Sequence, residues 1–167
     1  PLNVSKIRHE NKPVKDFVES GSEVYGYNED FNGNNQEGIG FYQCTQKDGK
    51  RCSAAKAYLV SILDRENLTV MTDTNVNKII IDNKKAVGVE CINKKGEYFI
   101  VSANKEVLLS SGAFGSPQIM LRSGIGPSNE ILKHDLEHHH DLPGVGKNLQ
   151  DHIDYLTVHR YNSMELI

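Results

Sequence analysis

The sequence predicts a mixed α and β chain, and three regions support that prediction. Branched apolar residues recur with a period of two between Leu68 and Val101, which is typical of short strands. Apolar residues recur at helical spacing after Ser53. An apolar run at 106–111 leads through glycines into a helix that a proline can open. These patterns favour an α+β arrangement in which an antiparallel β-meander packs beside a strand–turn–helix unit.

The first 45 residues predict a helix, a polar loop and a short strand. Pro13 suits a first helical turn, and Gly21 is expected to end the helix. The stretch 27–38 is dense in turn-forming residues and therefore predicts a loop. Phe31 within it favours a loop that is anchored to the rest of the protein, and a disordered segment is the alternative. Residues 39–45 are predicted as a strand.

The centre of the chain predicts a helix followed by the meander. Ser53 is expected to cap a helix that runs to about Leu63. Because the strands that follow are short and their connections tight, we expect an antiparallel order. The predicted strands cover residues 68–72, 76–81, 86–92 and 98–101, with polar turns at 82–85 and 93–96.

The strand–turn–helix unit has a clear start signal. Residues 106–111 are the predicted strand, and Ser116 is expected to be the N-cap of a helix that begins at Pro117 and that Gly124 ends. Such a unit can place backbone N–H groups and a positive helix end beside a phosphate, and an ordinary crossover is the alternative. The remaining predicted elements are a short helix at 128–134, capped by Ser128, and a strand at 155–161.

Composition excludes several classes of function. The 167 residues include 19 Lys and Arg against 22 Asp and Glu, and the net charge of −3 gives no electrostatic reason to expect nucleic acid or an anionic membrane as a partner. No apolar run approaches the roughly 18 residues that a membrane-spanning helix needs. The three cysteines are too few for a disulfide scaffold, so we expect reduced thiols and a cytoplasmic protein.

The sequence contains no complete catalytic or nucleotide-binding motif. The dinucleotide motif Gly-x-Gly-x-x-Gly and the P-loop are both absent. His134 and His138 are four residues apart with further histidines nearby, so a metal-binding module is one interpretation and solvated surface histidines are the other. The residues alone therefore predict an element suited to a cofactor, without a catalytic constellation.

Four blocks of sequence resemble, in order, those of the glucose–methanol–choline (GMC) flavoprotein oxidoreductases. Residues 112–127 are similar to the second signature of this family, and residues 141–152 are similar to the block that follows it. The two upstream blocks are residues 30–33 and 49–59. Within the family, the resemblance is to bacterial choline dehydrogenases and related alcohol dehydrogenases.

The resemblance implies a central fragment of an FAD-dependent alcohol dehydrogenase, which oxidises a CH–OH group by hydride transfer to flavin. The family's Gly-x-Gly-x-x-Gly turn and its catalytic histidine have no counterpart here, so the isolated chain is expected to be inactive and no catalytic residue is assigned. His152 lies in a different block and is expected to be structural. No metal site is expected. The residues that the resemblance places at FAD are Val76, at the adenine, and Ser111, Gly112 and Ala113, at the adenosine and diphosphate.

The resemblance also implies a division into domains and a set of partners. Residues 1–52 would begin the substrate domain and cover the flavin, residues 53–127 would belong to the FAD-binding domain, and residues 128–167 would return to the substrate domain. The expected partner is a small-molecule alcohol such as choline, and membrane association of the parent protein is one expectation for its location. An incomplete sheet favours dimerisation of the fragment. The alternative function is a non-catalytic binding module derived from a flavoprotein.

Overall fold

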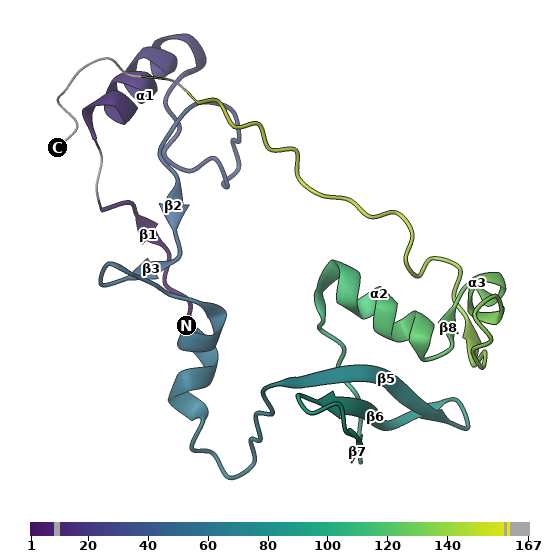
Figure 1. Cartoon of the computed structure of the whole chain (residues 1–167). Helices are drawn as coiled ribbons and strands as arrows, with labels where there is room; N and C mark the ends of the chain where they lie inside the picture. Colours follow the sequence, from purple (N-terminus) through teal and green to yellow (C-terminus); the bar gives the residue numbers. More distant parts are fainter. Residues whose placement is uncertain (9–10, 159, 161–167) are drawn as a thin grey trace. The chain divides into compact units, whose positions relative to one another are not determined.

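The computed structural model describes residues 1–8, 11–158 and 160, and the chain divides into two compact units. Unit 1 comprises Pro1–Val70 together with the segment from Tyr155, and unit 2 comprises Met71–Asp154. Figure 1 shows that each unit contains both helices and strands. The predicted mixed α and β class is therefore confirmed.

Unit 1 has short strands and one long helix. Two of the strands are joined by a polar hairpin turn at Asp48 and Gly49. Both residues have positive φ, as this type of hairpin turn requires, and Asp-Gly is a pair of residues that favours it. The predicted strand at 39–45 is shorter than expected, because only its last part pairs as a strand and Ile39 makes an isolated bridge. The strands are β1 (Ser5–Lys6), paired with β2 (Gln43–Cys44), and β3 (Gln46–Lys47), paired with β4 (Lys50–Arg51).

Helix α1 (Lys12–Tyr25) has its predicted start and a later end than predicted. The Asn11 side chain caps it by accepting a hydrogen bond from the backbone N–H of Val14 at 3.1 Å. The expected stop at Gly21 is wrong, since the helix continues to Tyr25, and Gly26, whose φ of 77° suits a helix end, is its C-cap. Gly21 instead lets Ile39 approach, because a Cβ at this position would lie 2.6 Å from the Ile39 side chain.

The polar loop that follows α1 is held by its own amide groups. The Nδ2 atom of Asn28 donates hydrogen bonds to the carbonyl oxygens of Asn35, at 2.8 Å, and Glu37, at 2.9 Å. The rings of Phe31 and Tyr42 meet edge to face with 5.6 Å between their centroids. The prediction of an anchored loop is confirmed over the alternative of a disordered segment.

The helical segment after Ser53 differs in type from the predicted α-helix. The Ser53 hydroxyl accepts a hydrogen bond from the N–H of Lys56 at 3.2 Å, so the predicted cap is confirmed. The chain then forms a π-helix, η1 (Ala55–Leu59), and a 3₁₀ turn, η2 (Val60–Ile62). Helical periodicity in the sequence indicates which residues coil and does not distinguish these hydrogen-bond patterns.

Unit 2 is built on the predicted antiparallel meander. Its strands are β5 (Thr74–Asp82), β6 (Lys85–Asn93) and β7 (Tyr98–Ser102), in that order across the sheet. Asn83 and Lys84 join β5 to β6 with positive φ at both residues, as a tight hairpin requires. The predicted strand at 68–72 is wrong, because these residues find no partner strand in the described part of the chain. Branched side chains favour a strand only where a neighbouring strand supplies pairing.

The strand–turn–helix prediction is corrected at both the strand and the helix start. Residues 106–111 are irregular, without a strand partner among the described residues, and helix α2 (Gly112–Arg122) begins five residues before Pro117. Ser116 is therefore inside the helix. Its hydroxyl reaches back to accept a hydrogen bond from the N–H of Ser111 at 3.0 Å, so it stabilises the helix start without being the N-cap.

The remaining elements of unit 2 pack at the end of α2. Strand β8 (Ile125–Gly126) pairs in parallel with β9 (His140–Asp141) around helix α3 (Ser128–Leu132). The predicted cap by Ser128 is wrong, because the Asp141 carboxylate accepts the N–H of Ser128 at 3.0 Å. The predicted strand at 155–161 is also wrong for residues 155–158 and 160, which have no regular structure, and its other residues lie outside the described part.

The turn after α2 explains why glycine occupies position 124. Gly124 has a φ of 74°, and a Cβ there would lie 2.1 Å from the carbonyl oxygen of Glu137. Gly146 has nearly the same φ, 75°, but its closest neighbour would be 3.7 Å away. The two positions share the conformational requirement and differ in packing, so they form a matched pair.

We predict that Gly124→Ala costs far more stability than Gly146→Ala. The second substitution carries only the left-handed backbone penalty of about 1–2 kcal/mol. The first adds a backbone collision, and a loss of about 4 kcal/mol is expected. Urea unfolding of the two variants measures both values, and equal losses would contradict the packing that the structure assigns to Gly124.

Candidate functional site

The first turn of α2 is exposed and suited to an anion. Residues 111–114 are all exposed, and Phe114 has 77% of its surface accessible. The first four N–H groups of an α-helix have no acceptor within the helix, and the peptide dipoles make this end partly positive. The N–H groups of Gly112 and Ala113 belong to this set. This end of α2 can therefore donate hydrogen bonds to a negatively charged ligand such as a phosphate.

Gly112 gives this helix end its open approach. Its φ of 81° lies in the left-handed region, which a side chain would strain. No atom lies within 4 Å of the position that a Cβ would occupy, so the structure leaves free space at this residue. The glycine therefore serves the turn into α2 and also leaves the backbone uncovered on that side.

Val76 lies on β5, the strand nearest to α2 in Figure 1. Its side chain is 38% exposed, and its register partner on β6 is Cys91. The pairing of β5 with β6 shifts between Val76 and Lys78, so an additional residue, Asn77, is inserted there as a β-bulge. Bulges bend a strand and free backbone groups from the ladder, which makes this stretch of β5 available to a ligand.

Cys91 lies directly opposite Val76 but has the properties of a core residue. Only 3% of its surface is accessible. Burial raises the pKa of the Cys91 thiol, and the adjacent Glu90 carboxylate raises it further. The thiol therefore remains protonated to higher pH than an ordinary cysteine, which makes it a poor nucleophile.

A buried serine attaches α2 to the sheet. The Ser123 hydroxyl accepts a hydrogen bond from the N–H of Ile79 on β5 at 2.8 Å and donates one to the carbonyl of Ile119 at 2.5 Å. Ser123 is 4% exposed, so both bonds are shielded from water. The C-terminal end of α2 is thus fixed to one point of β5.

Polar side chains make a second connection near the same end of α2. The Arg122 guanidinium donates a hydrogen bond to Oδ1 of Asn77 in the β5 bulge. Nδ2 of Asn77 in turn donates to Oε1 of Glu90 on β6. No pattern in the sequence indicates this bridge, because Asn77 and Arg122 are 45 positions apart.

The four residues predicted to bind FAD all lie in unit 2. Ser111, Gly112 and Ala113 are consecutive at the start of α2, and Val76 is on the strand to which the other end of α2 is attached. The structure thus places the exposed start of α2 and the bulge of β5 on two elements that Ser123 connects. None of the four side chains can act as an acid or a base.

The histidines do not converge in the part of the chain that the structure describes. No group of three or more His, Cys, Asp or Glu side chains that could hold a metal ion occurs among the described residues. His139 lies 3.8 Å from the Glu137 carboxylate, and Nε2 of His138 is buried without a hydrogen-bond partner within those residues. His152 is exposed in an irregular segment.

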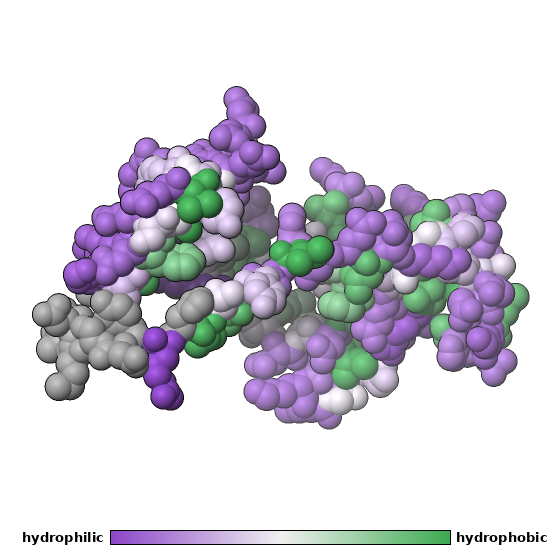
Figure 2. Space-filling view, turned by 90° about the horizontal axis from the view of Figure 1, so that it is seen from above, coloured by the Kyte–Doolittle hydropathy of each residue, from purple (hydrophilic) through white to green (hydrophobic). Residues whose placement is uncertain are grey.

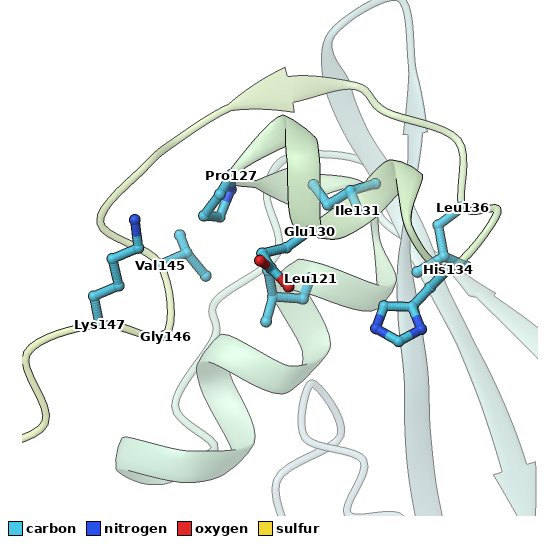
Figure 3. Close-up of a pocket in the computed structure, with 9 residues that line it drawn as sticks. All are labelled: Leu121, Pro127, Glu130, Ile131, His134, Leu136, Val145, Gly146 and Lys147. Carbon is cyan, nitrogen blue, oxygen red and sulfur yellow. The ribbon is translucent and has the colours of Figure 1, made fainter.

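Figure 3 shows a pocket beside α3 that sequence reasoning also missed. Its volume is about 350 Å³. The lining combines apolar residues with three polar or charged ones, and it includes Gly146 from the loop after β9. The lining residues are Leu121, Pro127, Glu130, Ile131, His134, Leu136, Val145, Gly146 and Lys147.

The fold of the chain is that of a segment of known FAD-dependent oxidoreductases. An FAD-dependent oxidoreductase from Chaetomium thermophilum matches 90% of this chain with a TM-score of 0.85 and 28% identity, over 27% of its own length. Pyridoxine 4-oxidase from Mesorbium loti matches 91% of the chain with a TM-score of 0.78 and 29% identity, over 30% of its length. These structures define the class of protein.

The sequence comparisons identify the family within that class. The GMC oxidoreductase family model matches residues 1–154. An alcohol dehydrogenase [acceptor] from Pseudomonas putida is 43% identical over 164 residues, which are 97% of this chain and 30% of that protein. An oxygen-dependent choline dehydrogenase from Rhizobium etli is 39% identical over 93% of the chain and 28% of its own length. The chain belongs to the GMC oxidoreductase family, and it spans about 30% of the length of these relatives.

The family assignment confirms the resemblance found in the sequence. Among the helices of the described residues, none has the length and apolar character needed to cross a bilayer.

We predict that Cys91 resists alkylation while Cys44 reacts. Cys44 is partly exposed, whereas the Cys91 thiol is buried and its raised pKa keeps it protonated at pH 8. Mass spectrometry after brief iodoacetamide treatment of the folded chain should find the label on Cys44 first. In urea, both cysteines should react at similar rates. Labelling of Cys91 as fast as Cys44 in the folded chain would contradict the packing of β5 against β6.

Proposed function

We propose that this chain is the part of an FAD-dependent GMC oxidoreductase that holds the adenosine diphosphate portion of the cofactor. The observation that supports this most directly is the exposed start of α2, where Gly112 combines a φ of 81° with free space around its Cα. In this proposal, the N–H groups of Gly112 and Ala113 donate to phosphate oxygens, Ser111 lies beside the adenosine, and the backbone of Val76 contacts the adenine.

The residues at this position fit such a cofactor. A dinucleotide diphosphate is negatively charged, and it matches the partial positive charge of a helix N-terminus. The absence of side-chain acids and bases among the four residues also fits a binding role. When bound, FAD supplies the acceptor for a hydride, and the residues of this segment bind and orient its remote half.

The proposed reaction is the oxidation of a CH–OH group in a small alcohol, with choline as the candidate substrate. The alcohol and choline dehydrogenases among the relatives support this choice. The assignment of residues 1–52 and 128–167 to the substrate domain and of 53–127 to the FAD-binding domain is part of the proposal. The whole enzyme should oxidise choline in a dye-reduction assay, and the isolated 167-residue chain should show neither turnover nor stoichiometric flavin.

Turnover by the isolated chain would contradict its proposed role as one part of the site. A whole protein that binds FAD and oxidises no alcohol would instead support the non-catalytic binding module. The three free cysteines support a reducing compartment, and we therefore propose a cytoplasmic location for the protein.

Exposed apolar residues near the end of the described chain support self-association of the isolated fragment. Ile153, Leu156 and Val158 are each more than 80% exposed, and Figure 2 shows apolar surface among polar areas. We expect a dimer in light scattering, because burial of these side chains between two copies removes them from water. Leu156→Asp should restore the monomer, and a monodisperse monomer of the unchanged chain would contradict this expectation.

We predict that Gly112→Ala weakens FAD binding by about tenfold in the whole enzyme. A methyl group at this position occupies the open approach to the helix N-terminus and strains the backbone. Gly96→Ala is the matched control, because Gly96 has a φ of 83° and equally free surroundings at the turn after β6. Titration of the apoenzyme with FAD, followed by flavin fluorescence, should separate the two variants. Equal affinities would contradict the proposed site.

A further inference from the structure

Asn77 joins three elements of unit 2 through one side chain. It accepts a hydrogen bond from Arg122 at the end of α2 and donates one to Glu90 on β6. Its own backbone forms the bulge of β5 between Val76 and Lys78. Asn77 is partly buried, as is Glu90. The side chain thus connects the strand that carries Val76 with the helix that begins at Gly112.

An amide is well suited to this position. Its N–H₂ group can donate to a carboxylate while its oxygen accepts from a guanidinium, and it adds no charge between the two. An aspartate at position 77 would still accept from Arg122 but could not donate to Glu90, and its charge would repel the Glu90 carboxylate. The identity of the residue is therefore more constrained than its partly exposed position suggests.

The bulge makes the position of Val76 depend on Asn77. A bulge residue is not held by the regular ladder, so side-chain contacts determine how far the strand bends there. Asn77 is adjacent to Val76 in the chain, and a shift of the bulge moves the Val76 backbone directly. The start of α2 is less affected, because Ser123 attaches the helix to Ile79 independently.

We infer that Asn77 is a positioning residue for the adenine portion of the flavin cofactor, acting through the backbone of Val76. This inference rests on the proposed function. Asn77 itself makes no contact with the cofactor in this proposal. Its role is to hold the bulge in one geometry by bridging Glu90 and Arg122.

The surrounding charges determine which substitutions give a clean test. Lys78 is in register with Glu90, and a surface pocket of about 380 Å³ also includes Glu137 and His139 near Arg122. A test that only removes charge would therefore disturb several pairs at once. Asn77→Asp combined with Glu90→Gln exchanges the amide and the carboxylate and keeps the net charge of the pair at −1.

The experiment measures the FAD affinity of the whole apoenzyme by flavin fluorescence. Asn77→Asp should weaken FAD binding by about tenfold, with kcat at saturating FAD within about twofold of the parent value. In the double variant with Glu90→Gln, the amide of residue 90 donates to the aspartate, and the aspartate accepts from Arg122. Affinity should then return to within about twofold of the parent value.

The matched control is Asn93→Asp. The Nδ2 atom of Asn93 donates to Oε2 of Glu97 at 2.7 Å in the turn after β6, so this substitution also removes a donor to a carboxylate. It should leave FAD affinity unchanged because it leaves the hydrogen bonds of Asn77 with Arg122 and Glu90 in place. If Asn77→Asp does not fold, Arg122→Met is a second probe, because it removes only the hydrogen bond that Arg122 donates to Asn77. We expect this variant to bind FAD about threefold more weakly than the parent enzyme.

Two results would overturn the inference. One is an FAD affinity that does not change in Asn77→Asp. If that variant does not fold, the corresponding result is an unchanged FAD affinity in Arg122→Met. The other is a loss in Asn77→Asp that Glu90→Gln does not restore, which would indicate a general structural role. If Gly112→Ala weakens FAD binding while Asn77→Asp does not, only the role of Asn77 fails. If the parent apoenzyme does not bind FAD, the proposed function itself fails.

Discussion

The organisation of unit 2 depends on a single buried hydroxyl. Ser123 completes the backbone hydrogen bonds of two different elements, because it accepts from Ile79 on β5 and donates to Ile119 in α2. A partner left unpaired at a site with 4% exposure would cost about 1–3 kcal/mol. This interaction places the end of α2 against an edge strand, and it occupies a backbone group through which another chain could have paired.

Close backbone packing surrounds that hydroxyl and explains the glycines that follow it. At Gly124 the chain passes so near Glu137 that no side chain fits, and its carbonyl accepts from the N–H groups of His139 and His140. At Gly126 the Leu121 side chain fills the space that a Cβ would need. The residues Ser123 to Gly126 are therefore constrained by packing, whereas Gly112, at the other end of α2, is open to its surroundings.

Local sequence patterns predicted the meander well, because alternation and turn chemistry are local and both agree with the final pairing. They failed where a distant partner decides the outcome. Residues 106–111 have a strand-like composition and no partner strand within the described chain, and the Ser116–Pro117 start signal is overridden by the turn at Gly112. The bridge from Asn77 to Arg122 joins residues 45 positions apart, and no spacing rule indicates it.

The contacts of α2 explain how its exposed start can have a fixed position. The start of α2 has few neighbours of its own, and the helix is held at its opposite end, by Ser123 and by the side chain of Arg122. A helix is stiff along its axis, so fixing one end restricts the other while leaving its N–H groups accessible. Attachment at one end therefore orders the start of α2 and leaves its N–H groups uncovered. The tightly packed residues, Ser123 and Gly124, and the exposed residues 111–114 therefore lie at opposite ends of α2.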